Sequence, residues 1–121
     1  MSDCIKTLQV RKAHEVFAER GPARRLTAIE ATFDRDCLFS HPRGRHVGHR
    51  ELEAPVIALH ARFPTHASPQ IGSVDGLQDS ARLAWEFGPP HQPRLITGRD
   101  VAAVNGGRIA VLFTFLDPTD A

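Results

Sequence analysis

Asp100 is the residue whose position most needs a chemical explanation. It interrupts an apolar segment that ends in Asn105-Gly106-Gly107, and a second apolar segment, 109–115, follows. Asn-Gly between two such segments predicts a β-hairpin, because a tight hairpin turn needs residues that accept a positive φ. A carboxylate within the first strand of that hairpin must therefore face water, a partner or a cavity. A carboxylate that faces a cavity is a candidate for acid–base chemistry.

Histidine is the second residue type that could carry chemistry, and His41, His46 and His49 lie close together in the sequence. Their spacing fits no known zinc site, and no cysteine or carboxylate completes a ligand set, so we expect no metal. Solvated loop histidines are the expected alternative. Three further histidines are expected at the surface, namely His60, His66 and His91.

Length and composition exclude several classes of protein. The 121 residues predict one domain, 1–121, that is long enough to bury a core. A net charge of +1 without a basic stripe argues against a nucleic-acid partner. The sequence has neither a membrane-spanning apolar run nor a signal-peptide pattern, so a cytoplasmic protein is expected. The two cysteines, Cys4 and Cys37, are too few for a disulfide framework.

The first half of the chain has mainly helical patterns. We expect helices from Ser2 to Gly21, from Pro22 to 34–36 and from about Glu51 to Pro64, with a short strand over 37–41. Pro55 lacks an N–H group, and it is tolerated in the third helix only if it lies in the first turn.

The second half of the chain is expected to form strands over 70–75 and 81–87 and a hairpin over 95–116. Helices that come early and strands that come late predict an α+β fold, with the helices on one face of an antiparallel sheet. The last strand is apolar on both faces, since 109, 111, 113 and 115 alternate with 110, 112, 114 and 116. Three helices cover one face only, so we expect a homodimer through the other sheet face.

Several segments resemble the SnoaL-like branch of the nuclear transport factor 2-like (NTF2-like) superfamily, which includes ketosteroid isomerase. They are Phe39-Ser40-His41-Pro42-Arg43-Gly44 with Gly48, and the segments 61–64, 81–85, 98–101 and 107–109. The resemblance covers almost the whole chain. It implies an α+β cone of the cystatin-like type, in which three N-terminal helices cover a strongly curved antiparallel (mixed) sheet. A pocket is then implied on the concave side.

The resemblance also implies roles for individual residues. His41, directly before Pro42, matches the general base of ketosteroid isomerase, although the family has a carboxylate there. Asp100 matches the acid of the oxyanion hole. The chain has no tyrosine, and Phe17 stands nearest to the position of the oxyanion-hole tyrosine. The steroid-isomerase reaction itself is therefore not expected.

In such a cone His41 and Asp100 both point into the pocket. The expected apolar wall consists of Phe17, Leu59, Leu83, Trp85, Ala102, Leu112 and Leu116. An apolar pocket with two convergent polar groups is the usual form of a small-molecule site. We expect an ionised Asp100 paired with His41, because this pairing relieves the desolvation of the carboxylate, raises the His41 pKa and orients the ring.

Two functions follow, and both stay open. The first is a cofactor-free isomerase, cyclase or dehydratase that acts on a small organic molecule. His41 would then serve as general base or as an imidazolium donor, with Asp100 as its partner. In the second, the same residues form a satisfied polar pair in a ligand-binding or dimerisation domain without catalysis.

Overall fold

The computed structural model describes residues 2–62 and 70–117. The helices are α1 (Ser2–Arg11), α2 (Pro22–Thr32) and α3 (Gly48–Arg62), and a π-helical segment, η1 (Lys12–Phe17), continues α1. The strands are β1 (Phe33–His41), β2 (Gly44–Val47), β3 (Gln70–Leu77), β4 (Ser80–Phe87), β5 (Ile96–Asn105) and β6 (Arg108–Leu116). The predicted α+β class is confirmed.

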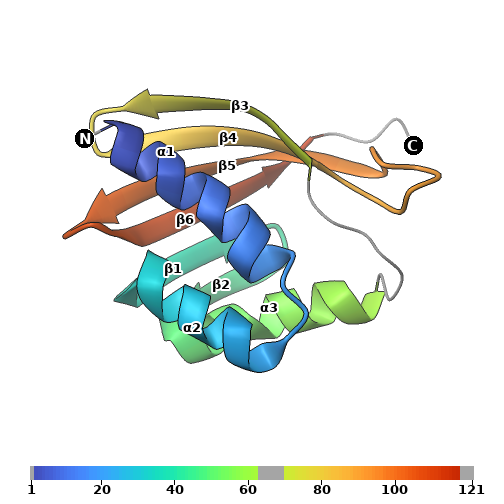
Figure 1. The fold of residues 1–121 in the computed structure, drawn as a ribbon, viewed down its shortest axis with the longest axis horizontal. Coiled ribbons are helices and arrows are strands. Elements are labelled where there is room, and N and C mark those ends of the chain that lie inside the picture. Colours follow the sequence, from blue (N-terminus) through green and yellow to red (C-terminus); the bar gives the residue numbers. More distant parts are fainter. Residues whose placement is uncertain (1, 63–69, 118–121) are drawn as a thin grey trace.

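The strands form one mixed, curved and open sheet in the order β2-β1-β6-β5-β4-β3 (Figure 1). Neighbouring strands are antiparallel except β1 and β6, which are parallel. The predicted hairpin is confirmed, because Asn105 pairs with Arg108 across Gly106 and Gly107. Both glycines have a positive φ, +63° and +82°, which residues with a side chain rarely adopt.

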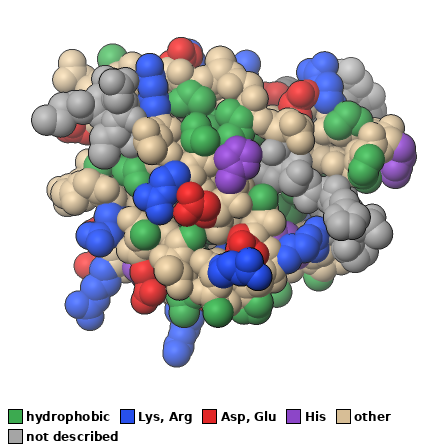
Figure 2. Space-filling view, viewed as in Figure 1, with side chains coloured by type: hydrophobic (Ala, Val, Ile, Leu, Met, Phe, Trp, Pro, Cys, Tyr) green, Lys and Arg blue, Asp and Glu red, His purple; other side chains and the backbone are tan. Residues whose placement is uncertain are grey.

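The helices cover one face of the sheet, as Figure 1 shows. Helix α1 packs on β3, β4 and β5, and α3 packs on β1 and β2. The core between these layers is apolar and includes Ile5, Leu8, Val16, Ile29, Phe33, Leu52, Val56, Ile109 and Leu112. On the helical face that Figure 2 shows, basic and acidic side chains are interspersed. No helix within the described residues is long and apolar enough to cross a membrane.

The boundary between α2 and β1 differs from the prediction. Helix α2 ends at Thr32, and β1 already begins at Phe33 instead of at Cys37. Phe33 pairs with Ile109 of β6, and the register then shifts before Leu38. The intervening segment 34–36 is largely exposed. Its charged residues therefore reach solvent from an irregular part of the strand, and they do not end the helix.

The start of α3 also differs from the prediction. Gly48, with a φ of +85°, turns the chain directly from β2 into the helix. The Glu51 carboxylate accepts a hydrogen bond from the Val47 backbone N–H at 2.8 Å, which holds this junction. Pro55 therefore lies in the interior of α3 and not in its first turn. The predicted end of this helix at Pro64 falls outside the described residues.

A bulge in β6 changes which side chains of that strand face the core. Val104 pairs with Ile109 but Ala103 pairs with Val111, so Ala110 is the extra residue. Ile109 consequently shares the buried face with Leu112, and the strict alternation predicted for this strand is wrong at its start.

Candidate ligand pocket

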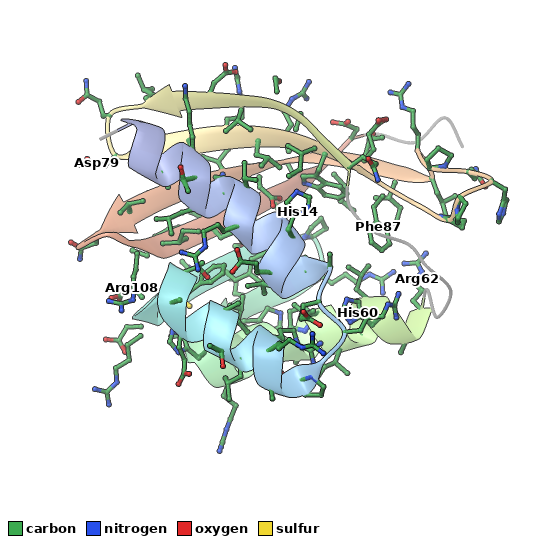
Figure 3. The ribbon with its side chains drawn as sticks, in the orientation of Figure 1. His14, His60, Arg62, Asp79, Phe87 and Arg108 are labelled. Carbon is green, nitrogen blue, oxygen red and sulfur yellow. The ribbon has the colours of Figure 1, made fainter. Side chains whose placement is uncertain are left out.

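A cavity of about 270 Å³ lies between η1, α3 and the concave side of the sheet. Its lining is largely apolar and includes Phe17, Phe39, Leu59, Leu83, Trp85, Phe87, Ile96 and Leu116. In Figure 3, Arg62 of α3 and Phe87 of β4, which both line the cavity, lie at one end of the molecule. Asp79 and Arg108, which mark two hairpin turns, lie at the opposite end.

The inner part of the cavity contains a buried ion pair. The Lys12 ammonium lies 2.5 Å from Oδ2 of Asp100, and the two side chains are only 1% and 9% exposed. Lys12 also donates to Oε1 of Gln9 at 2.5 Å. The amide of Gln9 in turn donates to the backbone carbonyl of Ala81 at 2.8 Å and to that of Asp100 at 3.1 Å. Helix α1 is thereby tied to β4 and β5 by polar contacts within the core.

The second oxygen of Asp100 is occupied as well. Oδ1 accepts hydrogen bonds from Nε1 of Trp85 at 3.0 Å and from the Thr114 hydroxyl at 2.8 Å. Gly98 makes room for the indole, since a Cβ atom there would lie 2.7 Å from Cζ2 of Trp85. With these donors and the ammonium, Asp100 is an acceptor on both oxygens and has the surroundings of an ionised carboxylate.

Lys12 is the first residue of the π-helical segment. The wide turn closes with a hydrogen bond of 3.0 Å from the Ala18 N–H to the Ala13 carbonyl, five residues back. Segments of this kind occur often at functional sites. Burial lowers the Lys12 pKa, and the charge and hydrogen bond of Asp100 oppose that lowering and favour the ammonium form.

Sequence reasoning missed Lys12 and Gln9, although the sequence contains a signal for both. Together with Val16 they recur at helical spacing from Ile5, which places two polar residues on the buried face of the first helix. A lysine on that face needs a carboxylate, and Asp100 is the carboxylate that interrupts an apolar strand.

His41 also lines the cavity, but its partner is a second histidine. Its Nε2 lies 2.8 Å from Nε2 of His46, and the two ring planes are nearly parallel, at 9°, with centroids 4.9 Å apart. The Arg43 backbone N–H donates to Nδ1 of His41 at 3.2 Å, so neutral His41 carries its proton on Nε2 and donates it to His46. Burial, with smaller contributions from His46 and Arg43, lowers the His41 pKa.

The expected pairing of His41 with Asp100 is not present in this structure. Within the described residues the Asp100 carboxylate is hydrogen-bonded to Lys12, Trp85 and Thr114, and the His41 ring is hydrogen-bonded to His46 and to the Arg43 backbone. The physical reason is that Lys12, the ammonium missed at the sequence level, neutralises the carboxylate. The His41 pKa is accordingly lowered and not raised.

The other candidate residues divide into two groups. Phe17, Leu59, Leu83, Trp85 and Leu116 surround the same cavity as His41 and Asp100. Ala102 and Leu112 share the inner face of the sheet but are fully buried beneath the helices, in the core and away from the cavity. Their position follows from the sheet register, which pairs them with each other two residues beyond Asp100 and Thr114.

Two further histidines are not the solvated residues that were expected. His60 donates from Nε2 to the Phe17 carbonyl at 2.7 Å, and burial lowers its pKa. His49 contacts the Phe33 carbonyl at 3.0 Å. His91 is exposed, and His66 lies outside the described residues. Over residues 2–62 and 70–117, no three side chains of His, Cys, Asp or Glu converge as a metal site would require.

Comparisons with known proteins identify the fold. No protein-family model and no curated protein matches the sequence. A protein from Agrobacterium tumefaciens, provisionally described as an isomerase of the SnoaL-like family, matches at a TM-score of 0.86 and 22% identity, over 96% of this chain and 99% of that one. A provisional SnoaL-like polyketide cyclase from Jannaschia sp. CCS1 matches at 0.78 and 12% identity, over 96% and 87%.

A third structure, from Methylobium petroleophilum PM1, is described as a protein of unknown function with a cystatin-like fold. It matches at a TM-score of 0.75 and 13% identity, over all of this chain and 80% of that one. At these identities the likeness concerns the fold. The chain therefore has the curved-sheet α+β fold of the SnoaL-like and cystatin-like proteins.

Proposed function

We propose that this chain binds a small, largely apolar organic molecule in the cavity beneath η1 and α3. The observation that carries the proposal is an apolar cavity of about 270 Å³ whose inner part contains the Lys12–Asp100 pair. Ligand sites commonly combine an apolar wall with a few fixed polar groups. Trp85 and Thr114, which hold Asp100, line the same cavity, so a ligand would meet an ordered polar floor.

Trp85 offers a direct test, because it is the sole tryptophan of the chain and lines the cavity. Its emission is expected to change saturably when cyclohexanone or decan-1-ol is titrated into the protein. Leu59→Phe should weaken binding about tenfold by filling the cavity. Ile57→Phe is the matched control, since Ile57 is exposed on the same helix and does not line the cavity. Linear, unsaturable changes with both probes would contradict the proposal.

Catalysis is a second candidate, and the state of His41 favours it. A lowered pKa leaves the imidazole neutral at pH 7, which is the form a general base requires. Nδ1 of His41 would take a proton from a carbon atom of the ligand and would then lose the hydrogen bond that the Arg43 N–H donates to it. The proton on Nε2 could pass to His46. The Lys12 ammonium would stabilise negative charge on a carbonyl oxygen. Proton transfer next to a carbonyl is the reaction such groups suit, as in isomerisation, cyclisation or dehydration.

The catalytic candidate is tested by following deuterium exchange next to the carbonyl of cyclohexanone in D₂O by NMR. His41→Ala should slow protein-dependent exchange about a hundredfold, the usual scale for a general base. His91→Ala, at an exposed site, should leave the rate unchanged. An unaltered rate in His41→Ala, with Trp85 still reporting binding, would leave a binding protein without this chemistry.

A further inference from the structure

Lysine is rare in this chain, and one of its two lysines lines the cavity. Of the 15 basic side chains, 13 are arginine, and only Lys6 and Lys12 are lysine. Helix α1 lies across the sheet (Figure 1), and Lys12 follows directly after it. An arginine would also supply a positive charge at this place. A guanidinium does not lose its proton in proteins, however, whereas an ammonium that loses a proton becomes a nucleophilic amine.

The surroundings of the Lys12 amino group favour the loss of that proton. The side chain is only 1% exposed. Burial lowers the Lys12 pKa, and Asp100 offsets this lowering only in part. Oδ2 of Asp100 lies 2.5 Å from Nζ and can accept the proton. A lysine that is desolvated in apolar surroundings is activated as a nucleophile towards carbonyl groups.

The hydrogen bonds of Lys12 leave room for a ligand. In the described part of the chain, Nζ donates to Asp100 and to Gln9. An ammonium has three N–H groups, so a third remains for a ligand oxygen. The ring centroid of Phe17, which lines the cavity, lies 5.9 Å from Nζ. A carbonyl group bound by the third N–H would have its carbon atom close to Nζ, as an addition reaction requires.

We propose that Lys12 forms a covalent iminium with an aldehyde or ketone bound in the cavity. Asp100 takes one proton from the ammonium, and the free amine adds to the carbonyl carbon while its second proton moves to the oxygen. Asp100 then returns its proton to that oxygen, the C–O bond breaks, and water leaves. One ammonium and one carbonyl group thus give one iminium and one water. Nζ keeps its positive charge, so Asp100 keeps its partner.

The inference rests on the proposed function, and it adds the carbonyl class of the ligand and a covalent step. Cyclohexanone and sodium cyanoborohydride at pH 7 test it, because hydride from the borohydride reduces an iminium to a stable secondary amine. Mass spectrometry of the whole chain and of its proteolytic peptides then locates the product. We expect one cyclohexyl group per chain, on Lys12, formed about tenfold faster than any product on Lys6.

The two lysines provide matched variants. Lys6 lies in α1, is half-buried and does not line the cavity, so Lys6→Arg should keep the adduct. Lys12→Arg keeps a positive charge beside Asp100 and should abolish the adduct. If Lys12→Arg does not fold, peptide mapping of the unaltered protein and of Lys6→Arg still decides the question. Cyclohexanol has the same ring without a carbonyl group, and it should slow the labelling of Lys12 by occupying the cavity.

The possible failures can be told apart. Saturable binding of cyclohexanone, followed by Trp85 emission, without an adduct on Lys12 would overturn this inference and leave the proposed function intact. Equal labelling of Lys6 and Lys12, or labelling that cyclohexanol does not slow, would also overturn it, since the reaction would then not depend on the cavity. Binding of decan-1-ol but not of cyclohexanone would have the same meaning. Binding of neither probe would overturn the proposed function and this inference together.

Discussion

Lys12 and Asp100 depend on each other because both are largely shielded from water. Removing one charge of a buried pair leaves the other desolvated without a partner, which is more damaging than removing both. Asp100→Asn is therefore expected to lower the free energy of unfolding by about 3 kcal/mol. Lys12→Met combined with Asp100→Asn should lower it by less than the sum of the two single changes. Urea unfolding of the four proteins gives this coupling.

The exposed Arg82–Asp75 pair is the control for this prediction. Its two side chains are 61% and 60% exposed, so Asp75→Asn should change stability by less than about 1 kcal/mol. Similar losses in Asp100→Asn and Asp75→Asn would mean that the inner pair does not contribute as a buried pair.

Two half-buried histidines, His41 and His60, predict how stability responds to pH. Burial lowers the pKa of His41 and His60 below the ordinary value of 6.5, so the folded state binds fewer protons than the unfolded state. With respect to these two groups the folded state is most stable above pH 6.5. This stability is lost as the pH falls from there towards the lowered pKa values. Urea midpoints measured from neutral to mildly acidic pH should therefore decline.

Substitution of single histidines tests which side chain causes this loss of stability at acidic pH. His60→Gln keeps an N–H donor for the Phe17 carbonyl but cannot titrate, and it should flatten the pH dependence. His91→Gln, at an exposed position, should leave the curve as it is. A slope that is unchanged in both His60→Gln and His41→Gln would exclude these two rings as the cause.

At the scale of elements, the contact between β4 and β5 positions Trp85. The indole lies over Gly98, and an alanine Cβ would stand 2.7 Å from Cζ2 and 2.5 Å from the Phe115 carbonyl. Gly98→Ala should therefore displace the ring, break its hydrogen bond to Asp100 and lower stability by about 1 to 3 kcal/mol. Trp85 emission should shift in the absence of any ligand.

Gly72→Ala is the matched control for Gly98→Ala. Gly72 lies in β3 of the same sheet, where a Cβ atom would make an ordinary contact of 3.5 Å with Ala84. Its substitution should leave both stability and emission nearly unchanged. Unaltered Trp85 emission in Gly98→Ala would show that the indole does not need the space above this glycine.

Local signals explain which elements could be predicted. Between two strands, Asn105-Gly106-Gly107 favours a tight hairpin turn, and the hairpin lies where expected. By contrast, the start of β1 depends on the pairing of Phe33 with Ile109, which lies far away in the sequence. The bulge at Ala110 likewise depends on which residue of β5 each residue of β6 meets. Such long-range pairings override local propensity, and the local patterns of a single sequence do not reveal them.

The candidate site shows the same division. The sequence marked Asp100 as a misfit and grouped it with His41, and both line one cavity. It did not disclose the partners, because the helix that carries Lys12 reaches β5 only through tertiary packing. Lys12 neutralises the Asp100 carboxylate, and His41 pairs with His46 instead. Both contacts depend on distances between side chains that the spacing of residues in the sequence does not reveal.

For the whole molecule, the sheet has an outer face that the helices leave uncovered. Alternation from the buried Leu112 directs Val111, Phe113 and Phe115 to that face. Phe113 and Phe115 are 40% and 60% exposed, and Val47 of β2 is 55% exposed. The register joins them into a stripe, since Leu38 pairs with both Val47 and Val111, and Phe113 pairs with Val101.

We propose that a second copy of the chain covers this stripe and forms the homodimer expected from the apolar last strand. Light scattering at micromolar concentration should then give twice the mass of one chain. Phe115→Lys should shift the population to single chains, because a dimer would bury the ammonium without a partner. Ile57→Lys, at an exposed apolar position of α3, should leave the dimer intact. A single-chain mass for the unaltered protein would show that the exposed phenylalanines face solvent and need no partner.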